Sequence, residues 1–134
     1  TNSGAGYSQL AQLQKAAALI ASDDHNGAIS IYDSLADTPN TDRMIADLAV
    51  ILAGIHRIDA DRADEATERL LELSEGTGPW RHLAREIRAL ALLKSGNEQR
   101  ARELLASLVG DPTSPPGVRS RATEVLGTLN PNAS

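Results

Sequence analysis

The amino-acid sequence predicts an all-α domain built from seven helices. Aromatic residues make up only 2% of the chain, and β-branched and aromatic residues are few relative to Ala, Leu, Arg and Glu, so intrinsic preferences favour helix throughout. Clusters of Gly, Pro, Asp, Asn and Ser divide the chain into seven segments of helical length. Apolar residues recur every three or four positions within each segment, which is the pattern of an amphipathic helix.

The seven segments pair into three helical hairpins followed by one further helix. The hairpins span about residues 6–37, 41–75 and 79–110, and the last helix spans about residues 115–129. The chain of 134 residues is long enough to bury one core, so we predict a single domain over residues 1–134. We expect the last helix to cap the apolar edge of the third hairpin through Val118, Val125, Leu126 and Leu129.

Small residues recur at a fixed spacing in the three hairpins. The two members of each pair stand twelve positions apart, as Ala16 and Ala28, Gly54 and Ala66, and Ala89 and Ala101. A bulky residue follows the second member four positions later, as Tyr32, Leu70 and Leu105. This arrangement resembles the tetratricopeptide repeat, which has small residues where its two helices cross closely, although Arg57 stands in place of an aromatic residue. The resemblance implies a right-handed superhelix of tetratricopeptide-like hairpins.

Two longer phrases narrow the resemblance to one family. The phrases AISIYDSLA, from Ala28 to Ala36, and GPWRHLARE, from Gly78 to Glu86, are similar to the extracytoplasmic part of the proteobacterial membrane-anchored tetratricopeptide proteins related to the ancillary subunit of the Sec translocon, in their alphaproteobacterial form. This resemblance implies a protein–protein interaction module and no enzyme. It also implies a transmembrane helix ahead of Thr1, a place at the periplasmic face of the inner membrane, and contacts with the secretion translocon, periplasmic chaperones or translocating chains. A soluble cell-envelope assembly scaffold and a hydrolase stay open as alternatives.

The charge balance argues against nucleic acid as a partner. The formal net charge is −5, and the 13 basic residues are interleaved with 18 acidic ones, which leaves no basic footprint for a phosphate backbone. Cys is absent, which excludes disulfides and thiolate metal ligands. No apolar run approaches the roughly 18 residues that span a bilayer, so membrane contact is expected only through the helix ahead of Thr1. The sequence does not set the oligomeric state.

The sequence predicts no catalytic residue, no cofactor and no metal site. Three histidines, His25, His56 and His82, lie at least 26 positions apart, and no pair has the spacing of metal ligands on one helix. We therefore expect solvated or capping histidines. No Ser lies in a nucleophile elbow, and the glycines around Thr77 lack the Lys of a phosphate-binding loop. That segment, followed by Pro79 at a natural first helical position, is typical of a helix end and a new helix start.

An acidic cluster before the fourth segment superficially resembles a calcium loop. Asp59 and Asp61 have the starting spacing, but Asp64 stands where the turn Gly is needed and Leu70 replaces the closing Glu. Acidic side chains are favourable at the positive end of a helix. We expect Asp61, Asp64 and Glu65 to cap and complement the fourth helix instead.

The strongest candidate for a contact surface lies at the start of the fifth segment. Arg81, Arg85 and Arg88 recur at helical spacing beside Trp80, and both residue types are enriched at the energetic centres of protein interfaces. Because Arg forks recognise carboxylates, the predicted protein-binding residues Trp80, Arg81, Arg85 and Arg88 suit an acidic partner segment. The alternative is that the arginines form ion pairs within the chain and that Trp80 fills the junction between hairpins.

Overall fold

The computed structural model describes the backbone of residues 2–129 and the side chains of residues 8–129, so Thr1 and residues 130–134 of the predicted domain lie outside the described residues. Within that range the protein is all-α, as predicted, with eight helices and no strand. None of the described helices is long and apolar enough to cross a membrane. The helices are α1 (Asn2–Ala21), α2 (His25–Asp37), α3 (Arg43–Asp59), α4 (Ala63–Arg69), α5 (Leu71–Glu75), α6 (Arg81–Lys94), α7 (Glu98–Gly110) and α8 (Pro116–Leu129).

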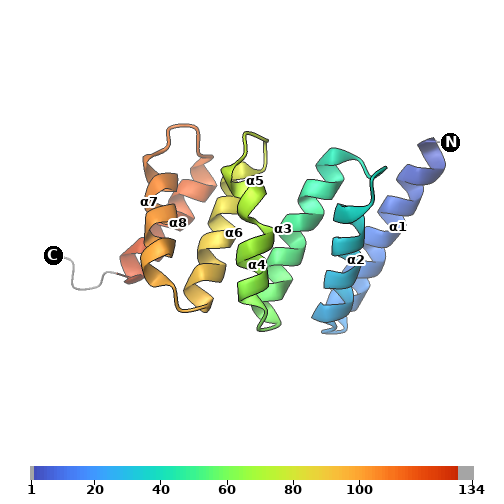
Figure 1. Cartoon of the computed structure of the whole chain (residues 1–134), viewed down its shortest axis with the longest axis horizontal. Coiled ribbons are helices and arrows are strands. Elements are labelled where there is room, and N and C mark those ends of the chain that lie inside the picture. Colours follow the sequence, from blue (N-terminus) through green and yellow to red (C-terminus); the bar gives the residue numbers. More distant parts are fainter. Residues whose placement is uncertain (1, 130–134) are drawn as a thin grey trace.

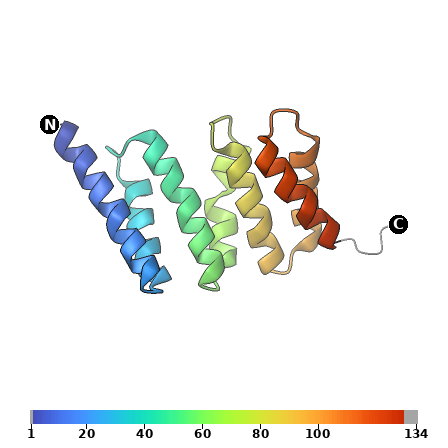
Figure 2. The ribbon, with the colours of Figure 1, turned by 180° about the vertical axis from the view of Figure 1, so that it is seen from behind.

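The helices stand in two layers along the length of the molecule (Figure 1). One layer holds α2, α4 with α5, and α7, and the other holds α1, α3, α6 and α8, as the view from behind also shows (Figure 2). Helices that follow one another in the chain pack against one another, and α6 packs in addition against α3 and α4. The molecule is therefore a row of antiparallel helical hairpins, with α1 at one end and α7 and α8 at the other.

Polar side chains fix the starts of several helices where the turn clusters were predicted. Asp24 accepts a hydrogen bond from the backbone N–H of Gly27 at 2.9 Å, and Asp42 accepts one from the N–H of Met44 at 2.9 Å. Asn97 has the same place before α7. Such caps satisfy backbone donors that the first turn leaves without partners, each at a gain of about 1 kcal/mol.

Two predicted helix starts are wrong in detail. The residue that precedes α4 is Arg62, without a side-chain cap, whereas Asp61 lies in the preceding turn with φ 60°. Asp64 and Glu65 do lie in the first turn of α4, where a carboxylate complements the helix dipole. Pro79 does not begin the next helix, which starts at Arg81. The sequence pattern marks these boundaries only to within one or two residues.

The prediction of one continuous fourth helix is also wrong. Leu70 separates α4 from α5, with backbone torsions of −88° and −9° that depart from regular helix. Its side chain is completely buried and lies against the backbone of Gly54 in α3. Apolar periodicity does not register a bend at one residue, because Leu73 continues the same stripe beyond it.

Three apolar clusters make up the core, one at each place where three helices meet. The first joins α1, α2 and α3, the second joins α3, α4 and α6, and the third joins α6, α7 and α8. Gly54 is buried, and the alanines predicted at the helix crossings have no exposed surface, namely Ala16, Ala28, Ala66, Ala89 and Ala101. Small side chains are needed there because larger ones would overpack the crossing.

The last helix covers the apolar edge of the third hairpin. Val118 and Ala122 are buried beside Leu105 and Leu108 of α7, and Val125, Leu126 and Leu129 pack against the same cluster. Rows of helical repeats need a terminal element of this kind, since each repeat exposes one apolar face to the next.

Candidate functional site

All three of the predicted arginines of α6 form hydrogen bonds within the chain. Arg88 is only 8% exposed, and its Nε donates a hydrogen bond to the backbone oxygen of Thr67 at 3.1 Å. Arg85 donates to the backbone oxygen of Ser74 at 3.2 Å, and Arg81 donates to the loop that precedes α6 at 3.2 Å. The expectation of a solvent-facing stripe is wrong for Arg88, because its side chain is buried between α4 and α6.

Trp80 and the charges next to it also join parts of the fold. Trp80 is partly buried and packs against the core cluster of α3, α4 and α6. Buried Glu86 accepts two hydrogen bonds from Arg121 of α8, at 2.7 Å and 2.9 Å, in a bidentate pair. This geometry favours the alternative interpretation, in which these residues hold the hairpins to one another.

A charged network connects the first hairpin to the second. Arg57 of α3 is 3% exposed and pairs with Asp33 of α2 and with Glu65 of α4. Arg62 donates to Glu65 at 2.8 Å, and Arg69 donates to Asp33 at 3.2 Å. The hydrogen bond from Arg62 and the nearby Arg57 lower the pKa of Glu65 to about 2. Because these partners come from three helices, the network fixes the position of α4 beside α2.

A groove of about 690 Å³ lies next to this network, in the layer that contains α2 and α4. Apolar side chains from α3 and α5 contribute to its lining, among them Ala46, Val50 and Leu73. Further lining comes from the end of α2 and from the loop of residues 76–79. Its size falls within the range of about 300–1,000 Å³ that is usual for ligand clefts.

The charges around the groove are predominantly acidic. Arg43 pairs with Asp47 at 3.6 Å, and Arg69 pairs with Asp37 at 3.5 Å, so both cations of the lining are already partnered. Two further carboxylates, Glu68 and Glu72, are exposed on the groove wall formed by α4 and α5, four positions apart. The residual charge of the groove is therefore negative, the opposite of what the arginines of α6 had suggested.

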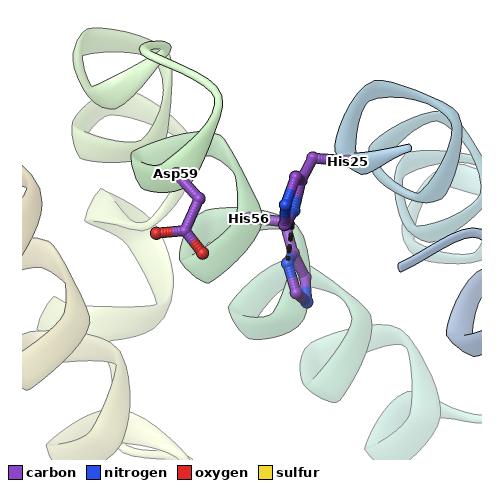
Figure 3. Close-up of side chains that lie close together, drawn as sticks. All are labelled: His25, His56 and Asp59. Atoms are coloured by element: carbon purple, nitrogen blue, oxygen red, sulfur yellow. Dashed lines mark hydrogen bonds between the residues drawn. The ribbon is translucent and has the colours of Figure 1, made fainter. Parts of the chain in front are cut away.

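The structure brings together two of the histidines that were expected to be separate (Figure 3). The Nδ1 atoms of His25 and His56 lie 3.2 Å apart, and the two rings are tilted by 32°. Asp59 follows one turn later on α3, and one ligand atom from each of the three residues lies within 4.8 Å of the others. Burial lowers the pKa of His56, and His25 lowers it further, whereas Asp59 acts in the opposite direction. The sequence led us to expect solvated or capping histidines, whereas these two rings are half-buried and contact each other.

The third histidine, His82, is held by polar contacts to the loop before α8. His82 is buried, and its Nε2 lies 3.2 Å from Oδ2 of Asp111 and 3.0 Å from the hydroxyl of Thr113. Thr113 donates to Asp111 from both its hydroxyl and its backbone N–H, and these bonds lower the pKa of that carboxyl to about 2. This cluster ties the start of α6 to the loop before α8.

Comparison with known proteins identifies no significantly similar protein. No family model matches the chain, and neither a curated protein nor a solved structure is significantly similar to it. The functional conclusions therefore rest on the residues and geometry of this chain.

Sequence reasoning missed the groove and the histidine pair for one shared reason. The residues that form each of them come from different helices, and the distance along the chain between His25 and His56 says nothing about their distance in space. One signal was available for the groove. Glu68 and Glu72 share a helical face with no basic residue four positions from either. The one basic residue three positions away, Arg69, pairs with Asp33 and Asp37 in the structure.

Proposed function

We propose that this chain is a protein–protein interaction module with a tetratricopeptide-like arrangement of three hairpins and a capping helix. The twelve-residue spacing of small residues and the stacking of hairpins in a row support this assignment. The phrases around Tyr32 and Trp80 further support placing it in the family of membrane-anchored ancillary Sec translocon subunits, at the periplasmic face of the inner membrane. On this proposal the chain binds translocon components, chaperones or translocating chains and is not an enzyme.

The groove between α2 and α4 is the surface that carries the proposal. Its lining combines apolar contacts from Ala46, Val50 and Leu73 with the carboxylates of Glu68 and Glu72, neither of which has an ion-pair partner among the described residues. An extended segment with alternating apolar and basic side chains matches both features. Its apolar side chains can enter the apolar lining while its basic side chains reach the carboxylates of Glu68 and Glu72. Each cation of the lining has a carboxylate partner within the chain, Arg43 with Asp47 and Arg69 with Asp37, so the groove keeps a net negative charge.

The affinity should be modest. The two carboxylates are exposed, so ion pairs formed with them gain little energy individually and weaken as salt is added. A groove of this size accepts only a few side chains of a partner. The surface buried by such a contact is well below the area that a stable permanent interface buries. Weak, salt-dependent capture suits a protein that must release the segments it holds.

A labelled model peptide tests the groove directly. The probe is a peptide of about eight residues with alternating Lys and Leu, roughly 27 Å long when extended, and its analogue has Glu in place of Lys. Fluorescence anisotropy should show saturable binding of the Lys peptide, with little binding of the Glu analogue. The double variant Glu68→Lys with Glu72→Lys should weaken binding at least roughly tenfold, which corresponds to about 1.4 kcal/mol.

The matched control is the pair Glu103→Lys and Glu124→Lys. Both carboxylates are exposed on α7 and α8, away from the groove, and the change in net charge is the same. Binding should stay within about twofold of the wild type, which is less than 0.5 kcal/mol. Equal weakening by both double variants would show that only overall charge matters, and equal binding of the two peptides would refute the groove as the site.

The secretion assignment needs a separate experiment. The protein with its natural N-terminal segment is recovered from solubilised membranes, and the associated proteins are identified. Secretion components among them support the tethered module, and a hydrophobic span of about 20 residues encoded ahead of Thr1 supports the anchor. A cleavable signal sequence ahead of Thr1, with other envelope proteins recovered, favours the soluble scaffold instead.

A further inference from the structure

One polar cluster takes no part in the proposed groove, and it has the composition of a metal site. His25 is the first residue of α2, and His56 and Asp59 lie in the last turn of α3. The two helices are antiparallel, so the start of one faces the end of the other, and Figure 3 shows the two rings meeting across this contact. The three side chains contribute two imidazole nitrogens and one carboxylate, which are ligands that zinc and related ions prefer.

The nitrogen atoms already have the separation of two ligands on one ion. With metal–nitrogen bonds of 2.0–2.1 Å, two ligands of a tetrahedral ion lie about 3.4 Å apart. The observed distance between the Nδ1 atoms of His25 and His56 is 3.2 Å. Only one hydrogen fits between the two nitrogens, so at least one lone pair points into the space between the rings. An ion needs to displace one proton and widen the gap only slightly.

Asp59 provides the third ligand, from an exposed position. Its ligand oxygen lies within 4.8 Å of the nitrogens, and its side chain is exposed, so a change of rotamer brings it closer without disturbing the core. Three protein ligands leave one position of a tetrahedral ion for water.

Neighbouring residues hold both rings in the required orientation. The Nε2 of His25 lies 3.1 Å from Oδ1 of Asp23, a contact that favours the ring hydrogen on Nε2 and so favours Nδ1 as the ligand atom. The ring of Tyr32 stacks on His56 with 6.1 Å between ring centroids and 15° between planes. A carboxylate behind a histidine and a packed ring are the usual supports of metal-binding imidazoles.

We propose that His25, His56 and Asp59 bind one divalent transition-metal ion of the zinc class, which clips the start of α2 to the end of α3. Two nitrogen ligands disfavour Mg²⁺ and Ca²⁺, which require oxygen. The ion stabilises the junction of the first two hairpins at the start of α2 and the end of α3, whereas the groove is lined by the opposite ends of these two helices. This inference does not depend on the proposed function.

Titration of the chain, without an affinity tag, tests the site. Isothermal calorimetry with ZnCl₂ should give one ion per chain, visible absorption with CoCl₂ should indicate a four-coordinate ion, and MgCl₂ should give no binding. Zinc should raise the melting temperature, and EDTA should reverse the rise, because an ion that binds only the folded chain stabilises it. The variants His25→Gln and His56→Gln should each weaken binding at least roughly tenfold, and Asp23→Asn should weaken it by about tenfold through loss of ring orientation.

The matched control is His82→Gln, which removes the one histidine outside the cluster and should leave zinc affinity within about twofold. Asp59→Asn changes only an exposed side chain, so it tests the site even where a histidine variant folds poorly. Absence of saturable zinc binding to the wild type overturns the proposal. Zinc affinity that is unchanged in His25→Gln, His56→Gln and Asp59→Asn overturns it as well, because the ion would then be adventitious.

Discussion

Gly54 is the position where the packing of two helices allows the sharpest test. A Cβ atom added at Gly54 would lie 2.9 Å from Cδ1 and 3.3 Å from Cγ of Leu70. Leu70 has no exposed surface, so any shift of its side chain has to be accommodated within the packed core. The perturbation is Gly54→Ala, in the wild type and in a Leu70→Ala background.

Two opposing contributions determine how much Gly54→Ala changes the free energy of unfolding. Replacing Gly by Ala within a helix stabilises by about 0.8–1.0 kcal/mol through propensity alone. Overpacking a filled core costs about 1–3 kcal/mol, so Gly54→Ala should destabilise the wild type by about 1 kcal/mol. Leu70→Ala alone should cost about 2–5 kcal/mol, but it removes the atoms that the new methyl group would meet. In that background Gly54→Ala should stabilise by about 1 kcal/mol, so the sign of its effect reverses.

Urea unfolding followed by circular dichroism gives the four free energies of unfolding. The control is Gly127→Ala on α8, where an added Cβ has no atom within 4 Å, and it should stabilise by several tenths of a kcal/mol in both backgrounds. A Gly54→Ala effect of the same sign and size in both backgrounds would refute the close contact between α3 and Leu70.

Two further predictions concern the end of the row and its charged junctions. Truncation after Asp111 removes α8 and exposes Leu105 and Leu108, so the shortened chain should melt at a lower temperature and aggregate; a monomer of unchanged melting temperature contradicts the capping role. Glu65 and Asp111 have pKa values lowered to about 2, so their pairing stabilises the fold above pH of about 4–5 and is lost as the pH falls towards 2. The stability difference between the wild type and Glu65→Gln should therefore shrink over that range, and a difference independent of pH would contradict the assignment.

Much of the secondary structure, but little of the candidate site, follows from the sequence. The segments from Arg43 to Asp59 and from Arg81 to Lys94 are helices because their apolar residues recur at helical spacing, a local property. Local spacing also placed Arg81, Arg85 and Arg88 on one side of a helix. It does not report what faces that side, and the backbone oxygens of Thr67 and Ser74 face two of these arginines.

The sequence by itself determined most of the helices, to within one or two residues at their ends, and the small residues at the crossings, because each depends on neighbours within a few positions or on a repeated spacing. Only the tertiary structure decided which charged side chains form ion pairs within the chain and which remain available to a partner. Arg57 is buried with carboxylate partners on two other helices, Glu68 lines the groove without an ion-pair partner among the described residues, and His25 meets His56 because α2 and α3 pack together. Arg57 and Asp33 are 24 positions apart, and His25 and His56 are 31 positions apart. At that range the stacking of the hairpins, not the periodicity along each helix, determines which side chains meet.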